Sequence, residues 1–138
     1  MIRSLGFGIA MALAVAGCGS AATRVPLPSE PAPPRTILLA YLDALVDGDC
    51  ATARALAAPG LNGYPAGIWC DRPRVIDYRA PSPSDAPGGD PSSQLVYAVE
   101  INVTRGDESL PDGWRLWFFQ LEPQPDGVWR VTSSGSGP

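Results

Sequence analysis

The sequence predicts an α+β domain in which N-terminal helices pack on a curved, mostly antiparallel sheet of about four or more strands. Two observations carry this prediction. Apolar residues recur at helical spacing over residues 36–58, and the apolar period changes to two from residue 72 onward. Helices that come first and strands that follow are the order typical of this class.

Two helices are expected at the start of the domain. The first should cover 36–47, with Thr36 as its N-cap, and Gly48 can end it because glycine accepts a positive φ. Asp49 should then cap a second helix over 50–58. The apolar stripe of the first helix consists of Ile37, Leu38, Tyr41, Leu42, Ala44 and Leu45.

Four segments have the residue alternation of strands. They cover 72–80, 93–106, 113–123 and 127–134, and the polar residues 80–93 form a long loop between the first two. In the first strand, Val75 and Asp77 should face one side and Ile76 and Tyr78 the other.

The aromatic residues allow two interpretations. The apolar faces of 113–123 contain Trp114, Leu116 and Phe118 on one side and Trp117, Phe119 and Leu121 on the other. One face could line a pocket for an apolar ligand, while the other packs in the core or contacts a partner. The candidate pocket residues are Tyr41, Trp69, Tyr97, Trp114 and Phe118.

Composition excludes several functions. The 138-residue length indicates one domain. The ten basic residues are all arginine, form no basic stripe and are outnumbered by fourteen acidic ones, so we expect no nucleic-acid partner. Histidine is absent, which excludes Ser-His-Asp triads and histidine-containing metal sites in this chain. We expect neither a metal nor a cofactor.

The N-terminus has the pattern of an export signal. Arg3 precedes an apolar run over 5–17, which is short for a membrane span, and small residues lead to Cys18. The sequence "VAGC" at 15–18 resembles the lipobox of bacterial lipoproteins. This resemblance implies that residues 1–17 are removed, that Cys18 carries the lipid, and that the protein sits on the extracytoplasmic side of the cell membrane through this anchor.

A proline-rich segment follows the cysteine. Residues 18–35 contain five prolines, which disfavour helix and sheet, so this segment should be a tether between the anchor and a domain at 36–138. Cys50 and Cys70 then remain in an exported chain, and we expect them to form a disulfide, the alternative being two unbridged thiols.

Both ends of the domain resemble a known superfamily. "AYLDALVDGDCATARALAAP" at 40–59 resembles the opening helices of NTF2-like, or cystatin-like α+β, proteins. "DGVWRVTSSGSGP" at 126–138 resembles the last strand of small actinobacterial lipoproteins of this type. The matching positions of the helical motif are Tyr41, Ala44, Leu45, Gly48 and Asp49.

The resemblance implies an architecture that hosts both enzymes and non-enzymes. Related ketosteroid isomerases place a first-helix tyrosine against an aspartate base that follows the second helix. Tyr41 falls at the tyrosine position, but no acidic residue lies between Asp49 and Asp71, and related dehydratases need histidine. We therefore expect a non-catalytic interaction or accessory domain at the cell envelope. The alternatives are a binder of an apolar ligand and an isomerase-like enzyme. We expect the sheet to form the contact in a homodimer or with an envelope protein partner.

Overall fold

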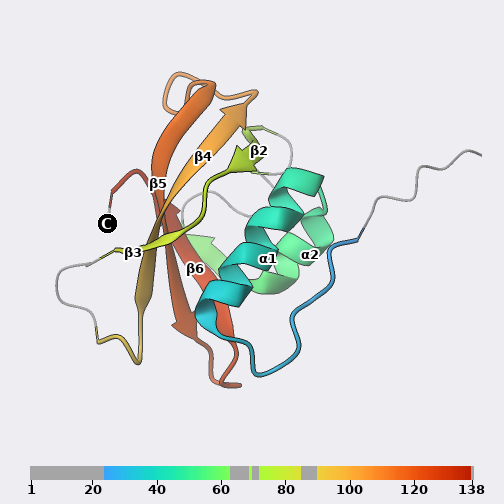
Figure 1. The fold of residues 1–138 in the computed structure, drawn as a ribbon, viewed down its shortest axis with the longest axis vertical. Coiled ribbons are helices and arrows are strands. Elements are labelled where there is room, and N and C mark those ends of the chain that lie inside the picture. The colour runs from blue at the N-terminus through green and yellow to red at the C-terminus, as the bar shows by residue number, and fades with distance from the viewer. Residues whose placement is uncertain (1–23, 63–68, 70–71, 85–89, 138) are drawn as a thin grey trace, which may run out of the picture.

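A computed structural model describes residues 24–62, 69, 72–84 and 90–137 of the chain. It confirms the predicted α+β class, with two helices packed on one face of a curled sheet (Figure 1). The helices are α1 (Pro34–Asp47) and α2 (Cys50–Leu56). The strands are β1 (Ala57–Asn62), β2 (Arg74–Tyr78), β3 (Ser82–Ser84), β4 (Leu95–Thr104), β5 (Gly113–Pro123) and β6 (Trp129–Gly135).

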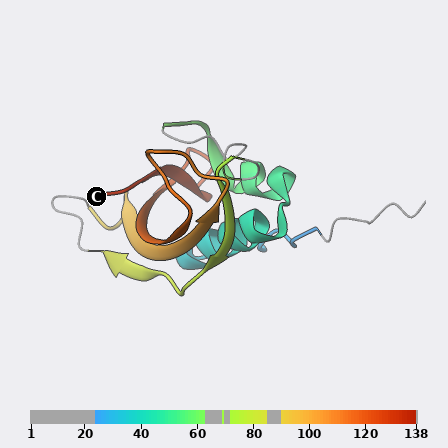
Figure 2. The ribbon, with the colours of Figure 1, turned by 90° about the horizontal axis from the view of Figure 1, so that it is seen from above.

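The sheet is mixed, with the order β1-β6-β5-β4-β2. Only the β1–β6 pair is parallel, and the remaining pairs are antiparallel. β3 pairs with residues 96–98 of β4 and β2 with residues 101–104, so these two short strands lie end to end along one edge. Seen from above, the sheet curls and the helices lie along one side of it (Figure 2).

The first helix begins earlier than expected. It starts at Pro34, its N-cap is Pro33 and no side chain caps it, so the expectation that Thr36 is the N-cap was wrong. Proline is suited to the first helical turn because its φ is already helical and its missing N–H would have no partner there. The C-terminal prediction is confirmed, since Gly48 takes the left-handed conformation with φ 72°.

The second helix is shorter than expected. Asp49 is its N-cap as predicted, and its carboxylate accepts the backbone N–H of Thr52 at 3.1 Å. The helix ends at Leu56 instead of residue 58, because Ala57 pairs with Val131 at the start of the parallel β1–β6 ladder. Tertiary pairing has here overridden the local helical pattern.

Two further differences concern the first part of the sheet. β3 lies within residues 80–93, which the sequence indicated to be loop. The strict alternation expected over 75–78 was also wrong: the register shifts between Val75 and Asp77, so that Ile76 and Asp77 both stand opposite Asn102. This bulge turns Ile76 and Asp77 to solvent together.

The core lies between α1 and the inner face of the sheet. The α1 stripe predicted from the sequence is buried in full, and α1 contacts both β2 and β6. On β5, Trp117, Phe119 and Leu121 are buried as one face, while Trp114 and Leu116 are exposed on the other. None of the helices in the described residues combines the length and the apolar character that crossing a bilayer requires.

The alternation along β5 makes a prediction about neighbouring residues. Phe119→Ala should lower the free energy of unfolding by about 3–5 kcal/mol, because it opens a cavity in the core. Phe118→Ala is the matched control on the outer face and should cost less than half of that. Urea unfolding of both variants measures the difference, and equal losses would contradict the assigned faces.

Candidate functional site

The concave side of the sheet is filled by aromatic side chains. Tyr41 of α1 meets Phe119 of β5 edge to face, with ring centroids 6.1 Å apart and planes at 66°. Trp69 meets Trp117 in the same way at 5.5 Å and 79°. All four rings are buried, and such pairs add to the stabilisation from apolar burial. The described part of the interior is therefore packed with rings.

The hydroxyl group of Tyr41 is an ionisable group within this interior. Its Oη is buried and has no hydrogen-bond partner among the described residues. Burial raises the pKa of Tyr41 well above its ordinary range, because the phenolate would lose its hydration. No carboxylate within the described residues bonds to it, so the tyrosine-acid pair of the isomerase alternative is not formed there.

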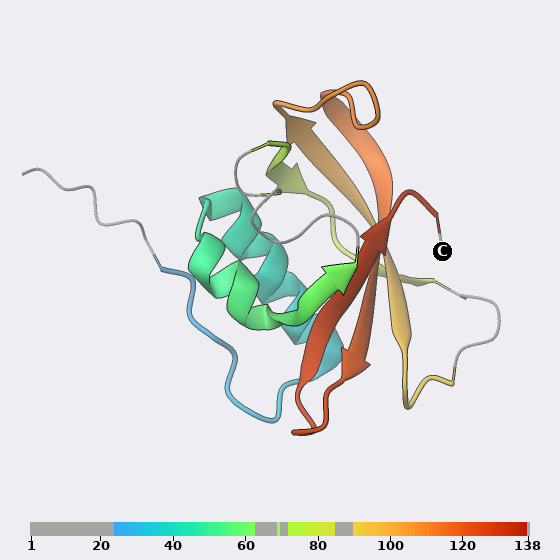
Figure 3. The ribbon, with the colours of Figure 1, turned by 180° about the vertical axis from the view of Figure 1, so that it is seen from behind.

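The outer face of the sheet carries an exposed apolar patch. We define the outer patch as Ile76 of β2 with Trp114 and Leu116 of β5, whose exposed fractions are 42%, 41% and 53%. Both helices lie on the opposite face of the sheet (Figures 1 and 3). Apolar side chains gathered on one face are typical of a contact surface.

Charged side chains border the outer patch. The guanidinium of Arg79 stacks on the Trp114 ring, 4.5 Å from its centroid. Its Nη1 also donates to the carboxylate of Glu100 at 2.7 Å, and both side chains are exposed. Glu100 stands opposite Leu116 in the β4–β5 ladder, so the ion pair adjoins the apolar residues. An apolar centre with a charged border is the usual anatomy of a protein interface.

The structure does not bring the five candidate pocket residues together. Tyr41, Trp69 and Tyr97 are buried in the core. Trp114 is exposed on the outer face, and Phe118, half-buried, shares that face of β5. The odd and even residues of one strand cannot line one cavity, because successive side chains point to opposite faces.

The cysteine predictions fall largely outside the described residues. Cys18 and Cys70 both lie there, as does the signal segment 1–17. Cys50 is the first residue of α2. Trp69, which precedes Cys70 in the sequence, is buried in the core. The Cys50–Cys70 disulfide and the lipidation of Cys18 therefore stay predictions. Within the described residues, no cluster of three or more potential metal ligands occurs.

A fastening of the N-terminal segment was missed by sequence reasoning. The backbone N–H of Val25 donates to Oδ2 of Asp49 at 3.0 Å, and the Thr52 hydroxyl donates to the same oxygen at 2.7 Å. The hydroxyl of Thr52 also lies 3.4 Å from the carbonyl oxygen of Val25. We call this group the Asp49 clasp. Asp49 was recognisable as a helix cap, but no local pattern indicates that its second oxygen binds a residue 24 positions away.

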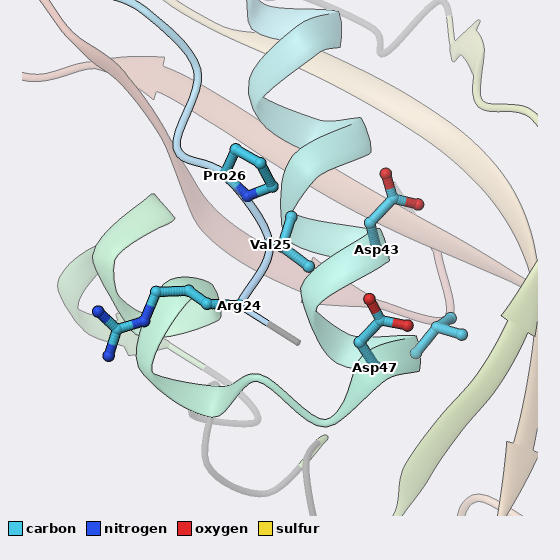
Figure 4. A pocket seen from close by; sticks show the side chains of 6 residues that line it. Arg24, Val25, Pro26, Asp43 and Asp47 are labelled. Carbon is cyan, nitrogen blue, oxygen red and sulfur yellow. The ribbon is translucent and has the colours of Figure 1, made fainter. Parts of the chain in front are cut away.

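The clasp places the proline-rich segment between two hollows. One, of about 270 Å³, is lined by Arg24, Val25, Pro26 and, from α1, Asp43, Val46 and Asp47 (Figure 4). The other, of about 450 Å³, lies toward α2 and is lined by Arg24, Val25, Pro26, Leu27, Ala51, Thr52 and Ala55. In Figure 4 the guanidinium of Arg24 points away from Asp43 and Asp47.

Hydrogen bonds lower the pKa of the Asp49 carboxyl. The Thr52 side chain, the Thr52 backbone and the Val25 backbone all donate to the charged form. The clasp is therefore fully formed above the ordinary pKa of an aspartate and weakens as acid protonates Asp49. Elsewhere on α1, Asp43 accepts the hydroxyl of Tyr78 at 2.7 Å. Burial first, and then this bond, raises the pKa of Tyr78.

Comparison with known proteins adds little to this geometry. No family model matches the chain, and no curated protein does. Among solved structures, the chain is similar to a ketosteroid isomerase-like protein from Shewanella frigidimarina. The two are 13% identical with a TM-score of 0.46, and the match covers 72% of this chain and 89% of the other. A likeness of this extent says nothing of the activity of this chain.

A substitution of Tyr41 can distinguish a packing role of this residue from a catalytic role. Tyr41→Phe should leave the free energy of unfolding unchanged or raise it by about 1 kcal/mol, because it removes a buried group without a bond. Above pH 10, the unfolded chain releases this proton while the folded chain keeps it, so stability falls with rising pH. Between pH 7 and pH 11, the free energy of unfolding of Tyr41→Phe should therefore fall by less than that of the wild type.

Chemical unfolding at pH 7 and at pH 11 measures both effects. A loss of more than about 1 kcal/mol at pH 7 would mean that the hydroxyl has a stabilising partner, as a catalytic tyrosine would.

Proposed function

We propose that this protein is a lipid-anchored lipoprotein of the cell envelope whose NTF2-like domain is a non-catalytic interaction module. Cys18 carries the acyl anchor on the extracytoplasmic side of the membrane. An anionic membrane repels an acidic domain, so the domain itself adds no attraction to the membrane. The anchor is nevertheless firm, because several acyl chains hold a protein far more strongly than one. The domain then presents its outer patch to a partner.

The exposed outer patch is the observation that carries this proposal. Ile76, Trp114 and Leu116 are large apolar residues that are 41–53% exposed, although Val99, Ile101, Phe119 and Leu121 on the inner face of the same sheet are fully buried. Taking such a side chain from full exposure to full burial is worth about 1.5–3 kcal/mol, and a partner surface would recover the part that the exposed half contributes. The interior supports the proposal as well, because its rings contact one another and fill the described concave side.

The partner proposed here is a second copy of this chain. A two-fold dimer uses the same patch on both subunits, so one apolar cluster with a charged border is sufficient. The outer patch has residues of β2 and β5, and the ion pair on its border contains one residue of each sign, Arg79 and Glu100. The same two charges could then exchange partners across the two-fold axis. An envelope protein is the other partner that the sheet could accept.

The alternative functions lack an observation of this kind. A ligand on the concave side of the sheet would need space that Tyr41, Trp69 and Phe119 occupy in the described interior. An isomerase would need an acid beside Tyr41, and none bonds to it among the described residues.

The anchor is tested by Cys18→Ser. This variant should lose the acyl chains, remain unprocessed or be released, and leave the membrane fraction, since no thiol is left to acylate. Intact mass and membrane flotation of the variant and the wild type measure this. A cleaved, lipidated Cys18→Ser protein in the membrane fraction would contradict the proposal.

The dimer is tested by Leu116→Glu, which places a charge in the outer patch. It should raise the dissociation constant at least tenfold, about 1.4 kcal/mol, because the carboxylate would be buried unpaired. Thr36→Glu adds the same charge at an exposed residue of α1, on the helix side of the sheet, and should have no effect. Sedimentation of the mature protein in detergent measures the oligomeric state. A wild type that stays monomeric at every concentration would overturn the second copy as partner.

A further inference from the structure

The described part of the proline-rich segment is held to the domain at two points, Val25 and Ala32. The Asp49 clasp holds Val25 through its N–H group and lies beside its carbonyl group. Val25 and Ala32 also pack, partly buried, against the hydrophobic core. Residues 25–33 thus follow the helix pair as part of the domain, although they contain no helix or strand.

This fastening shortens the free chain between the anchor and the domain. A tether that ended at residue 35 would allow a reach of about 60 Å from Cys18 when extended. Only seven residue steps separate Cys18 from Val25, and these span at most about 25 Å. The first fixed point of the domain therefore lies close to any anchor at Cys18.

We define the α2 corner as Arg24 and Leu27 with Ala51, Arg54 and Ala55 of α2. We propose that the Asp49 clasp sets the orientation of the domain on the membrane, with the α2 corner facing the phospholipid surface and the outer patch turned away from it. This inference rests on the proposed lipid anchor. The occupant of the corner is the headgroup layer of the bilayer that holds the anchor.

The residues at the corner fit a lipid surface. Leu27 is 60% exposed, the largest exposed fraction among the large apolar side chains of the described residues. It lines the 450 Å³ hollow with Pro26, Ala51 and Ala55. Three charged residues lie there: Arg24 lines the hollow, Arg54 is exposed on α2, and the carboxylate of Asp49 is bonded to Val25 and Thr52. Arginine heads suit phosphate groups, and the apolar residues suit the region below them.

Two acidic residues, Asp43 and Asp47, lie on the α1 side of the segment. They line the hollow on that side, and the guanidinium of Arg24 points away from both of them (Figure 4). The α2 corner therefore presents arginine and leucine, and the Asp49 carboxylate beside them accepts hydrogen bonds from Val25 and Thr52. The sheet face with the outer patch is on the opposite side of the molecule from the helices (Figures 1 and 3). In this orientation, the outer patch is accessible to its partner.

The absence of lysine from the chain permits a direct test. Arg54→Lys on α2 and Ser136→Lys near the C-terminus each introduce a single lysine, at exposed positions on opposite sides of the molecule. An amine-reactive donor dye is attached to each full-length, lipidated variant in phosphatidylcholine vesicles that carry an acceptor dye on the headgroups. The lysine-free wild type measures any labelling of the N-terminus.

Energy transfer should be at least twofold higher from position 54 than from position 136. Asp49→Asn, added to each variant, keeps a side-chain oxygen to cap α2 but replaces the second oxygen by an amide group that donates. The Val25 N–H then loses its acceptor. We expect the two transfer efficiencies to approach each other in this variant. A ten-residue Gly/Ser insertion between Thr23 and Arg24 should have the same effect, because it lengthens the chain between the anchor and Val25.

The outcomes separate this inference from the proposed anchor. Labelled protein that does not float with the vesicles would overturn the anchor itself. Protein that floats but gives equal transfer from both positions would overturn the orientation alone. A difference that survives both Asp49→Asn and the insertion would show that something other than the clasp orients the domain.

Discussion

The period of two along β5 is the constraint on which the rest of the structure depends. Because successive side chains of a strand leave on opposite faces, Trp117, Phe119 and Leu121 are buried against α1 while Trp114 and Leu116 are held in solvent. One strand thus supplies both the packed interior and the exposed patch. A slip of one residue in the β4–β5 register would exchange the two sets and destroy both.

The packed interior limits what this domain can do. A curled sheet closed on one side by α1 could hold a ligand if its concave face were lined by small or polar residues. Here Tyr41 meets Phe119 and Trp69 meets Trp117 at ring-contact distance, so aromatic side chains fill the concave side as far as the structure describes it. The proposals for this domain therefore concern its surface, namely the outer patch and the α2 corner beside the Asp49 clasp.

The two oxygens of Asp49 join the helix pair to the proline-rich segment. One oxygen caps α2 and the other binds Val25, so a single carboxylate both starts a helix and fixes the described beginning of that segment. A segment of this composition would be extended and free in isolation. Two hydrogen-bonding partners and the partial burial of Val25 are sufficient to hold it on the helix pair.

Local residue patterns by themselves determined the fold class, the α1 stripe, the Gly48 and Asp49 ends of the helices, and the two faces of β5. These follow from periodicity and from backbone preferences, which act within a few residues. Only the tertiary structure decided that Ala57 begins a parallel strand against Val131, that β2 bulges at Ile76, that Trp114 and Tyr41 lie on opposite sides of the sheet, and that Val25 is fastened to Asp49. Each of these depends on a contact between residues far apart in the chain, whose formation depends on the packing of the whole domain and leaves no mark in the local sequence.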